Sequence, residues 1–134
     1  LKLFWECHDP TQGMAQGNDT GTQYRSAIVV PNAELRQIAE ASRHRYQHLL
    51  SSAGRGTITT EISAGQPFFF AESYHQQYLA RPGSRPYCSA RPSGVLLDDQ
   101  WSGCAYKLPA TVWSHYDWSV SHCVLRGDNS PIAV

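Results

Sequence analysis

The sequence predicts an α+β domain in which helices cover one face of a small sheet. A long stretch with helical periodicity, residues 32–53, lies between two segments rich in apolar and β-branched residues, 25–30 and 57–62. A further apolar segment, residues 1–5, precedes them. A chain of 134 residues is long enough for one domain with a modest core.

The first segment is typical of the last part of an amphipathic helix, because residues 1–5 are mostly apolar. Pro10 ends it, since the residue before a proline is pushed out of the helical region. A polar, glycine-punctuated loop follows over residues 11–24, and residues 25–30 predict a buried strand with a short apolar run at its end. We expect the helix to begin upstream, so that the chain is a fragment or a processed product.

The central helix is predicted to begin after Asn32, whose side chain suits an N-cap, with Glu34 near the positive end of the helix dipole. Gly54 and Gly56 are expected to end it. Apolar residues recur at helical spacing and form one stripe: Leu35, Ile38, Ala39, Tyr46, Leu49 and Leu50. We expect this stripe to be the buried face.

Beyond the helix, residues 57–62 predict a strand, 68–70 a second short strand or extended segment, and 72–79 one or two helical turns. The pattern changes after Cys88, where prolines interrupt the chain and no clean period remains. We therefore divide the chain into a domain, residues 1–88, and a divergent, poorly structured tail, residues 89–134.

Composition excludes several classes of function. Eleven basic residues balance eleven acidic ones, so nothing in the net charge favours nucleic acid or an anionic membrane. No apolar run approaches the roughly 18 residues of a membrane span. Four widely spaced cysteines do not form a disulfide-dense scaffold, which favours reduced thiols in a cytoplasmic protein, with the mitochondrion as the alternative compartment.

Two blocks of sequence resemble one enzyme family. The first block spans residues 4–28 and contains Phe-Trp-Glu-Cys-His-Asp-Pro-Thr-Gln-Gly-Met, Gln-Gly-Asn-Asp and Gly-Thr-Gln-Tyr-Arg-Ser-Ala-Ile. The second, residues 68–79, contains Phe-Phe-Phe-Ala-Glu and Tyr-His-Gln-Gln-Tyr-Leu. Over residues 1–88 the chain is similar to the A-type peptide methionine sulfoxide reductases.

The resemblance implies a ferredoxin-like two-layer sandwich, here incomplete at the N-terminus. It also implies reduction of peptide-bound and free methionine S-sulfoxide, through a cysteine sulfenic acid and a disulfide that thioredoxin reduces. The implied partners are oxidised proteins or peptides and thioredoxin. The implied protein needs no bound cofactor or metal, and is a monomer.

Five residues match positions to which the family gives a role. Tyr24 would donate a hydrogen bond to the sulfoxide oxygen and wall the methyl slot, and Asp19 would orient the catalytic groups. His75 and Tyr78 would support the substrate site, and Cys88 would resolve the sulfenic acid. Other interpretations stay open: a core tyrosine, a turn aspartate, and a buried structural histidine.

The nucleophile motif of the family, Gly-Cys-Phe-Trp, does not occur in these 134 residues. The segment 103–106 (Gly-Cys-Ala-Tyr) resembles it faintly, and we attribute this to chance. We therefore expect the chain alone to be inactive, and a non-catalytic truncated isoform is the second hypothesis. Metal binding is a third, based on the adjacent pairs Cys7-His8 and His122-Cys123, which lack the ligand gap of ordinary zinc sites.

Overall fold

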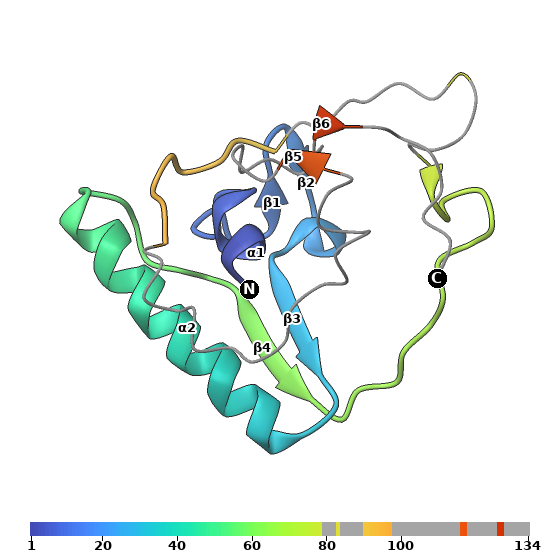
Figure 1. Cartoon of the computed structure of the whole chain (residues 1–134), viewed down its shortest axis with the longest axis horizontal. Coiled ribbons are helices and arrows are strands. Elements are labelled where there is room, and N and C mark those ends of the chain that lie inside the picture. The colour runs from blue at the N-terminus through green and yellow to red at the C-terminus, as the bar shows by residue number, and fades with distance from the viewer. Residues whose placement is uncertain (79–82, 84–89, 98–115, 118–125, 128–134) are drawn as a thin grey trace.

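The computed structural model describes residues 1–78, 83, 90–97, 116–117 and 126–127 (Figure 1). Within this part, helices and strands follow in this order: α1 (Lys2–Glu6), β1 (Ala15–Gln16), β2 (Asp19–Thr20), the 3-10 helix η1 (Thr22–Tyr24), β3 (Ala27–Val30), α2 (Ala33–Ser52), β4 (Glu61–Ala64), β5 (Tyr116–Asp117) and β6 (Arg126–Gly127). The sheets of the described residues are two-stranded: β1–β2, β3–β4 and β5–β6. The content is mixed helix and strand, as predicted.

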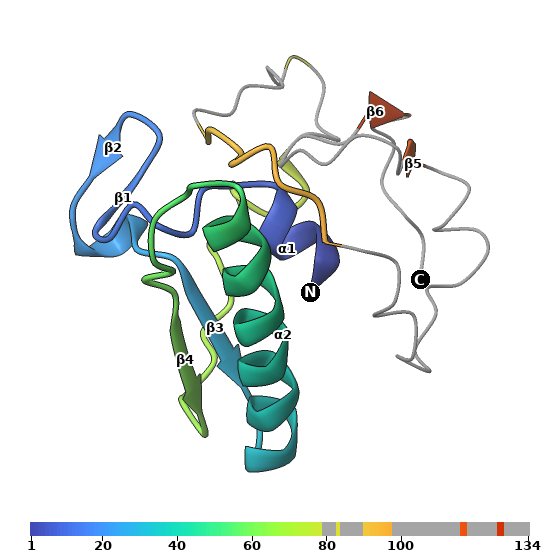
Figure 2. The ribbon, with the colours of Figure 1, turned by 90° about the vertical axis from the view of Figure 1, so that its left-hand side faces the viewer.

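The centre of the fold is a strand–helix–strand unit. β3 and β4 are parallel, in a register that runs from Ala27 opposite Glu61 to Val30 opposite Ala64. Parallel neighbours need a crossover connection, and α2 provides it, lying along one face of the two strands (Figure 2). The predicted order of strand, helix and strand is confirmed.

The second strand begins later than predicted. Residues 57–62 carry the β-branched pattern, but the strand spans Glu61–Ala64. Two residues before it are bonded elsewhere: the Thr59 amide donates to the Pro10 carbonyl at 2.9 Å, and the Ile58 amide to Gln47 Oε1 at 2.7 Å. Residues 58 and 59 therefore tie down the loop after α1 and the helix α2.

Both predicted ends of α2 are confirmed. The Asn32 side chain accepts a hydrogen bond from the Leu35 amide at 2.9 Å, which satisfies one of the free N–H groups of the first turn. At the other end, Gly54 has a φ of 68° and the Arg55 amide donates to the Leu50 carbonyl at 2.8 Å. The left-handed residue closes the helix, and glycine adopts it without a Cβ clash.

The predicted apolar stripe of α2 is only partly buried. Tyr46 and Leu50 are fully covered, whereas Leu35 and Ile38 are 41% and 42% exposed. The reason is the position of the core, which gathers Trp5, Tyr46, Leu50 and Leu97 near the C-terminal half of the helix. Val29 of β3 is also exposed, so β3 is not the fully buried strand that its apolar run predicted.

Trp5 joins α1 to α2 in this core. Its indole Nε1 donates to Ser42 Oγ at 2.9 Å, and its ring stacks on Tyr46 with centroids 5.7 Å apart. Ser42 in turn donates to the Ala39 carbonyl at 2.7 Å, so the buried hydroxyl has both a donor and an acceptor.

Residues 90–97, which the sequence assigned to the tail, pack on α1 and α2. Leu97 is 1% exposed, and its amide donates to Glu6 Oε1 at 2.6 Å. The Tyr46 hydroxyl donates to the Val95 carbonyl at 2.8 Å and lies 2.8 Å from Ser93 Oγ. This part of the tail is therefore built into the core.

The segment after β4 is extended. Phe68, Phe69 and Phe70 are 79%, 82% and 84% exposed, and they form no strand. A single turn follows, in which the amides of His75 and Gln76 donate to the Glu72 carbonyl at 2.8 and 3.3 Å. In the described part of the chain, no helix is long and apolar enough to cross a membrane.

Candidate functional site

The glycine-punctuated loop before β3 is a small, well-tied structure. β1 and β2 pair as an antiparallel hairpin, with Gln16 opposite Asp19. The Gly17 amide donates to Gln12 Oε1 at 2.8 Å, and the Gly21 amide to the Met14 carbonyl at 2.8 Å. Hydrogen bonds of this kind fix a loop that has little apolar surface of its own.

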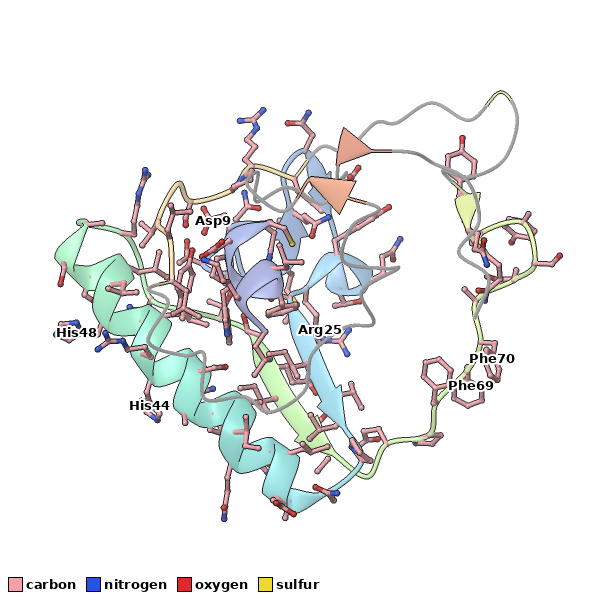
Figure 3. The ribbon with its side chains drawn as sticks, in the orientation of Figure 1. Asp9, Arg25, His44, His48, Phe69 and Phe70 are labelled. Carbon is pink, nitrogen blue, oxygen red and sulfur yellow. The ribbon has the colours of Figure 1, made fainter. Side chains whose placement is uncertain are left out.

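Tyr24 is the last residue of η1 and is 38% exposed. Its amide donates to the Gly21 carbonyl at 3.0 Å. The guanidinium of Arg25 holds this turn, since Nη1 donates to the Thr22 carbonyl and Nε to Glu61 Oε2, each at 2.9 Å (Figure 3). The ring therefore reaches solvent from a clamped backbone, which disfavours its interpretation as a core tyrosine.

Asp19 lies on the hairpin strand β2, and its side chain is exposed. It precedes Tyr24 by five positions in the same loop. The neighbouring Asn18 accepts a hydrogen bond from Arg91 Nη2 at 2.8 Å. Sequence reasoning missed Arg91, because nothing local indicates that residues 73 positions apart meet. The contact places the Arg91 guanidinium against Asn18, the residue before Asp19.

A chain of hydrogen bonds through His8, Ser26 and Thr60 supports the loop from the interior of the fold. His8 Nδ1 lies 2.7 Å from the Phe4 carbonyl oxygen, and Nε2 lies 2.8 Å from Ser26 Oγ. The carbonyl can only accept, so Nδ1 carries the proton and Nε2 accepts from the Ser26 hydroxyl. Ser26 Oγ lies a further 2.8 Å from Thr60 Oγ1, which completes the chain.

Burial sets the charge of this histidine. His8 is 6% exposed, and this desolvation lowers its pKa below the ordinary value, against smaller opposing effects of the Phe4 carbonyl and the Asp9 carboxylate. Both ring nitrogens are already engaged, which disfavours the metal interpretation of Cys7-His8. Burial also raises the pKa of the Cys7 thiol, whose Sγ lies 3.5 Å from the Phe4 carbonyl oxygen. No cluster of three or more metal-ligating side chains occurs in the described ranges.

A family profile described as peptide methionine sulfoxide reductase matches residues 1–100. The chain belongs to this family. A "Peptide methionine sulfoxide reductase MsrA" of Azotobacter vinelandii is 60% identical over 98 residues, which cover 72% of this chain and 44% of the relative. "Peptide methionine sulfoxide reductase MsrA 2" of Nostoc is 60% identical over 95 residues, covering 71% and 42%. This chain thus spans less than half the length of these relatives.

Among solved structures, "Methionine sulfoxide reductase A of Corynebacterium diphtheriae" aligns with 89% of this chain and 47% of its own, at 32% identity and a TM-score of 0.47. The match to the peptide methionine sulfoxide reductase profile runs past the boundary expected at residue 88. It includes residues 90–97, which pack on the core.

Two of the predicted site residues lie apart from the loop. His75 and Tyr78 belong to the segment that leaves the sheet after β4, at the right of Figure 1. Tyr78 is 49% exposed, and His75 is exposed with its ring 4.6 Å from that of Tyr74, so His75 is not the buried histidine of the alternative interpretation. Within the described ranges, no hydrogen bond links either of them to Tyr24. Cys88 lies outside the described residues.

Proposed function

We propose that this chain supplies the groups that assist the sulfoxide oxygen, Tyr24 and Asp19, in the active site of an A-type peptide methionine sulfoxide reductase. The observation that carries the proposal is the exposed phenol of Tyr24 on a clamped 3-10 turn, within the part that matches the family. The clamped turn fixes the backbone that presents this hydroxyl, and a phenol can donate to an oxygen on which negative charge develops.

The proposed reaction reduces methionine S-sulfoxide, free or in a peptide, to methionine. A cysteine thiolate attacks the sulfoxide sulfur while Tyr24 donates a hydrogen bond to the oxygen and Asp19 orients the reacting groups. The oxygen passes to the cysteine, so the products are a thioether and a cysteine sulfenic acid. A second thiol, for which we propose Cys88, attacks the sulfenic sulfur, releasing water and leaving a disulfide that the dithiol of thioredoxin reduces.

We assign the attacking cysteine to none of the 134 residues, because they contain no Gly-Cys-Phe-Trp motif. We propose negligible turnover for this chain alone. We also propose that the strand–helix–strand unit is one part of a ferredoxin-like two-layer sandwich and that the protein is a monomer in the cytoplasm, with the mitochondrion as the alternative. In that fold, His75 and Tyr78 would support the substrate site.

The test compares two proteins. One is the 134-residue chain, and the other is a chimera in which an A-type segment bearing Gly-Cys-Phe-Trp precedes residue 1. Each is given the S and R epimers of a methionine sulfoxide peptide with dithiothreitol or thioredoxin as reductant. We expect the chimera to reduce the S epimer and the 134-residue chain to reduce neither epimer. Turnover by the isolated chain, or a folded chimera without S-epimer activity, would contradict the proposal.

The second candidate function is a non-catalytic isoform that binds oxidised peptides. It rests on the same exposed Tyr24 side chain, which such a peptide would contact. It differs from the first in one measurement: the 134-residue chain would bind a methionine sulfoxide peptide without turnover, and would bind it more weakly after Tyr24→Ala. Absence of any such binding would remove this candidate and leave the first unaffected.

A further inference from the structure

Two histidines stand one helical turn apart on α2, outside the loop that carries the proposed activity. His44 and His48 are both exposed, and Figure 3 shows both labelled rings projecting from the outer side of the helix. Residues at i and i+4 of a helix lie one above the other on the same face, with Cβ atoms about 5–6 Å apart. Within the ranges that the structure describes, neither imidazole makes a hydrogen bond, an ion pair or a ring contact.

We propose that His44 and His48 form a bidentate binding site for a borderline divalent metal ion such as Zn²⁺ or Ni²⁺. Two imidazoles at this spacing can direct one nitrogen each to a common ion, which is how paired histidines on one helix face ligate zinc. Imidazole suits zinc and nickel, whereas calcium and magnesium require oxygen ligands. The inference is independent of the proposed reductase function.

Arg43 and Arg45 flank His44 in the sequence, and one carboxylate lies nearby. Glu40 lies one turn before His44, so a carboxylate, His44 and His48 follow one another at four-residue spacing along the helix. Glu40 is 27% exposed and forms ion pairs with Arg43 at 2.6 Å and Arg36 at 3.9 Å. The single negative charge of Glu40 offsets only one of the two guanidinium charges, so the two imidazoles, and not the surrounding charge, must hold the ion. Two protein ligands leave the other coordination positions to water, so the ion binds reversibly.

Binding must depend on pH and must stabilise the helix. Metal ligation requires the neutral imidazole, so affinity falls as the solution is acidified. Because the two ligands are brought together only when α2 is formed, the ion binds the folded state preferentially and raises the melting temperature.

The experiment is a calorimetric titration of the full 134-residue chain with zinc chloride and, separately, nickel chloride at neutral pH. We expect one reversibly bound ion per chain at this site. His44→Gln and His48→Gln should each weaken binding by at least about tenfold, the lower end of what loss of even an outer-shell partner costs. All four cysteines stay in every variant, so any binding by thiols remains an equal background.

A composition-matched control separates chelation from the mere number of histidines. The double variant His48→Ser with Ser52→His keeps the same residues but moves the second ring two turns from His44, about 12 Å along the axis. It should bind as weakly as the single variants, with unchanged helical circular dichroism. Equal affinity of the parent chain and this control would overturn the proposal. So would zinc-induced shifts of histidine ring protons in the NMR spectrum that spare His44 and His48.

Discussion

Nε2 of His8 lies 2.8 Å from Ser26 Oγ, which lies 2.8 Å from Thr60 Oγ1. The three side chains connect the end of α1 with the residues just before β3 and β4. Ser26 follows Tyr24 by two positions, so the backbone that presents the tyrosine is tied to the buried histidine. The imidazole thus links the interior to the exposed loop.

Removing this imidazole should lower the free energy of unfolding. His8→Ala removes the hydrogen bonds to the Phe4 carbonyl and the Ser26 hydroxyl at a partly buried place. Ser26 keeps Thr60 as a partner, so the expected cost of about 1–3 kcal/mol comes chiefly from the Phe4 carbonyl. Urea unfolding followed by tryptophan fluorescence measures the change. His75→Ala is the matched control, because His75 is exposed and should alter stability by no more than about 0.5 kcal/mol. Equal effects of the two substitutions would contradict this role of His8.

Stability should depend on pH through His8. Burial lowers the pKa of the folded imidazole below the ordinary 6.5 of the unfolded chain. The unfolded state therefore binds more protons in the window below about 6.5, and the free energy of unfolding rises with pH there. The stabilisation is complete above that value and is lost as the pH falls through the folded-state pKa. Urea midpoints between pH 5 and 8 should show this slope, and His8→Gln should reduce it; an unchanged slope in His8→Gln would rule out this histidine as its source.

The hydrogen bond from the Trp5 indole to Ser42 should contribute to the free energy of unfolding. Ser42→Ala leaves the buried Nε1–H of Trp5 without an acceptor, with a penalty of about 1–3 kcal/mol in unfolding free energy. Ser52→Ala, at the exposed end of α2, provides the comparison and should change stability by less than about 0.5 kcal/mol. Chemical denaturation of both variants decides the point, and a neutral Ser42→Ala would show that the indole finds another acceptor.

Adjacent leucines test whether the segment 90–97 belongs to the core. Leu97 is 1% exposed and Leu96 is 65% exposed. Leu97→Ala should destabilise the chain by about 2–5 kcal/mol, as for other buried leucines, whereas Leu96→Ala should be close to neutral. If thermal unfolding shifted equally in the two variants, the segment would not be packed as described.

Local signals explain what sequence reasoning recovered. Asn32 and Gly54 mark the ends of α2 through contacts with residues three to five positions away, so their chemistry is legible in the sequence. The later start of β4 could not be predicted from the sequence, because Thr59 pairs with Pro10, which is 49 positions distant. The same applies to Leu97, whose amide meets Glu6 across 91 positions.

In the candidate site, too, contacts between distant residues could not be predicted from the sequence. The family resemblance singled out Tyr24, but the sequence left a core tyrosine open, and its 38% exposure became known only from the structure. The support given by His8 was not recognised, because its partner Ser26 lies 18 positions away in the sequence. Leu35 and Ile38 have the period of a buried stripe, yet periodicity alone cannot tell where along a helix its partners end.

The proposed role of the Tyr24 hydroxyl is to assist sulfoxide reduction. It is tested by kcat/KM for the S epimer in the chimera that carries a Gly-Cys-Phe-Trp segment, with and without Tyr24→Phe. Loss of this one hydroxyl should lower kcat/KM by about 10²–10³-fold, the range for removal of a single donor to a developing oxyanion, while the melting temperature stays the same. A folded Tyr24→Phe chimera with undiminished kcat/KM would contradict the account.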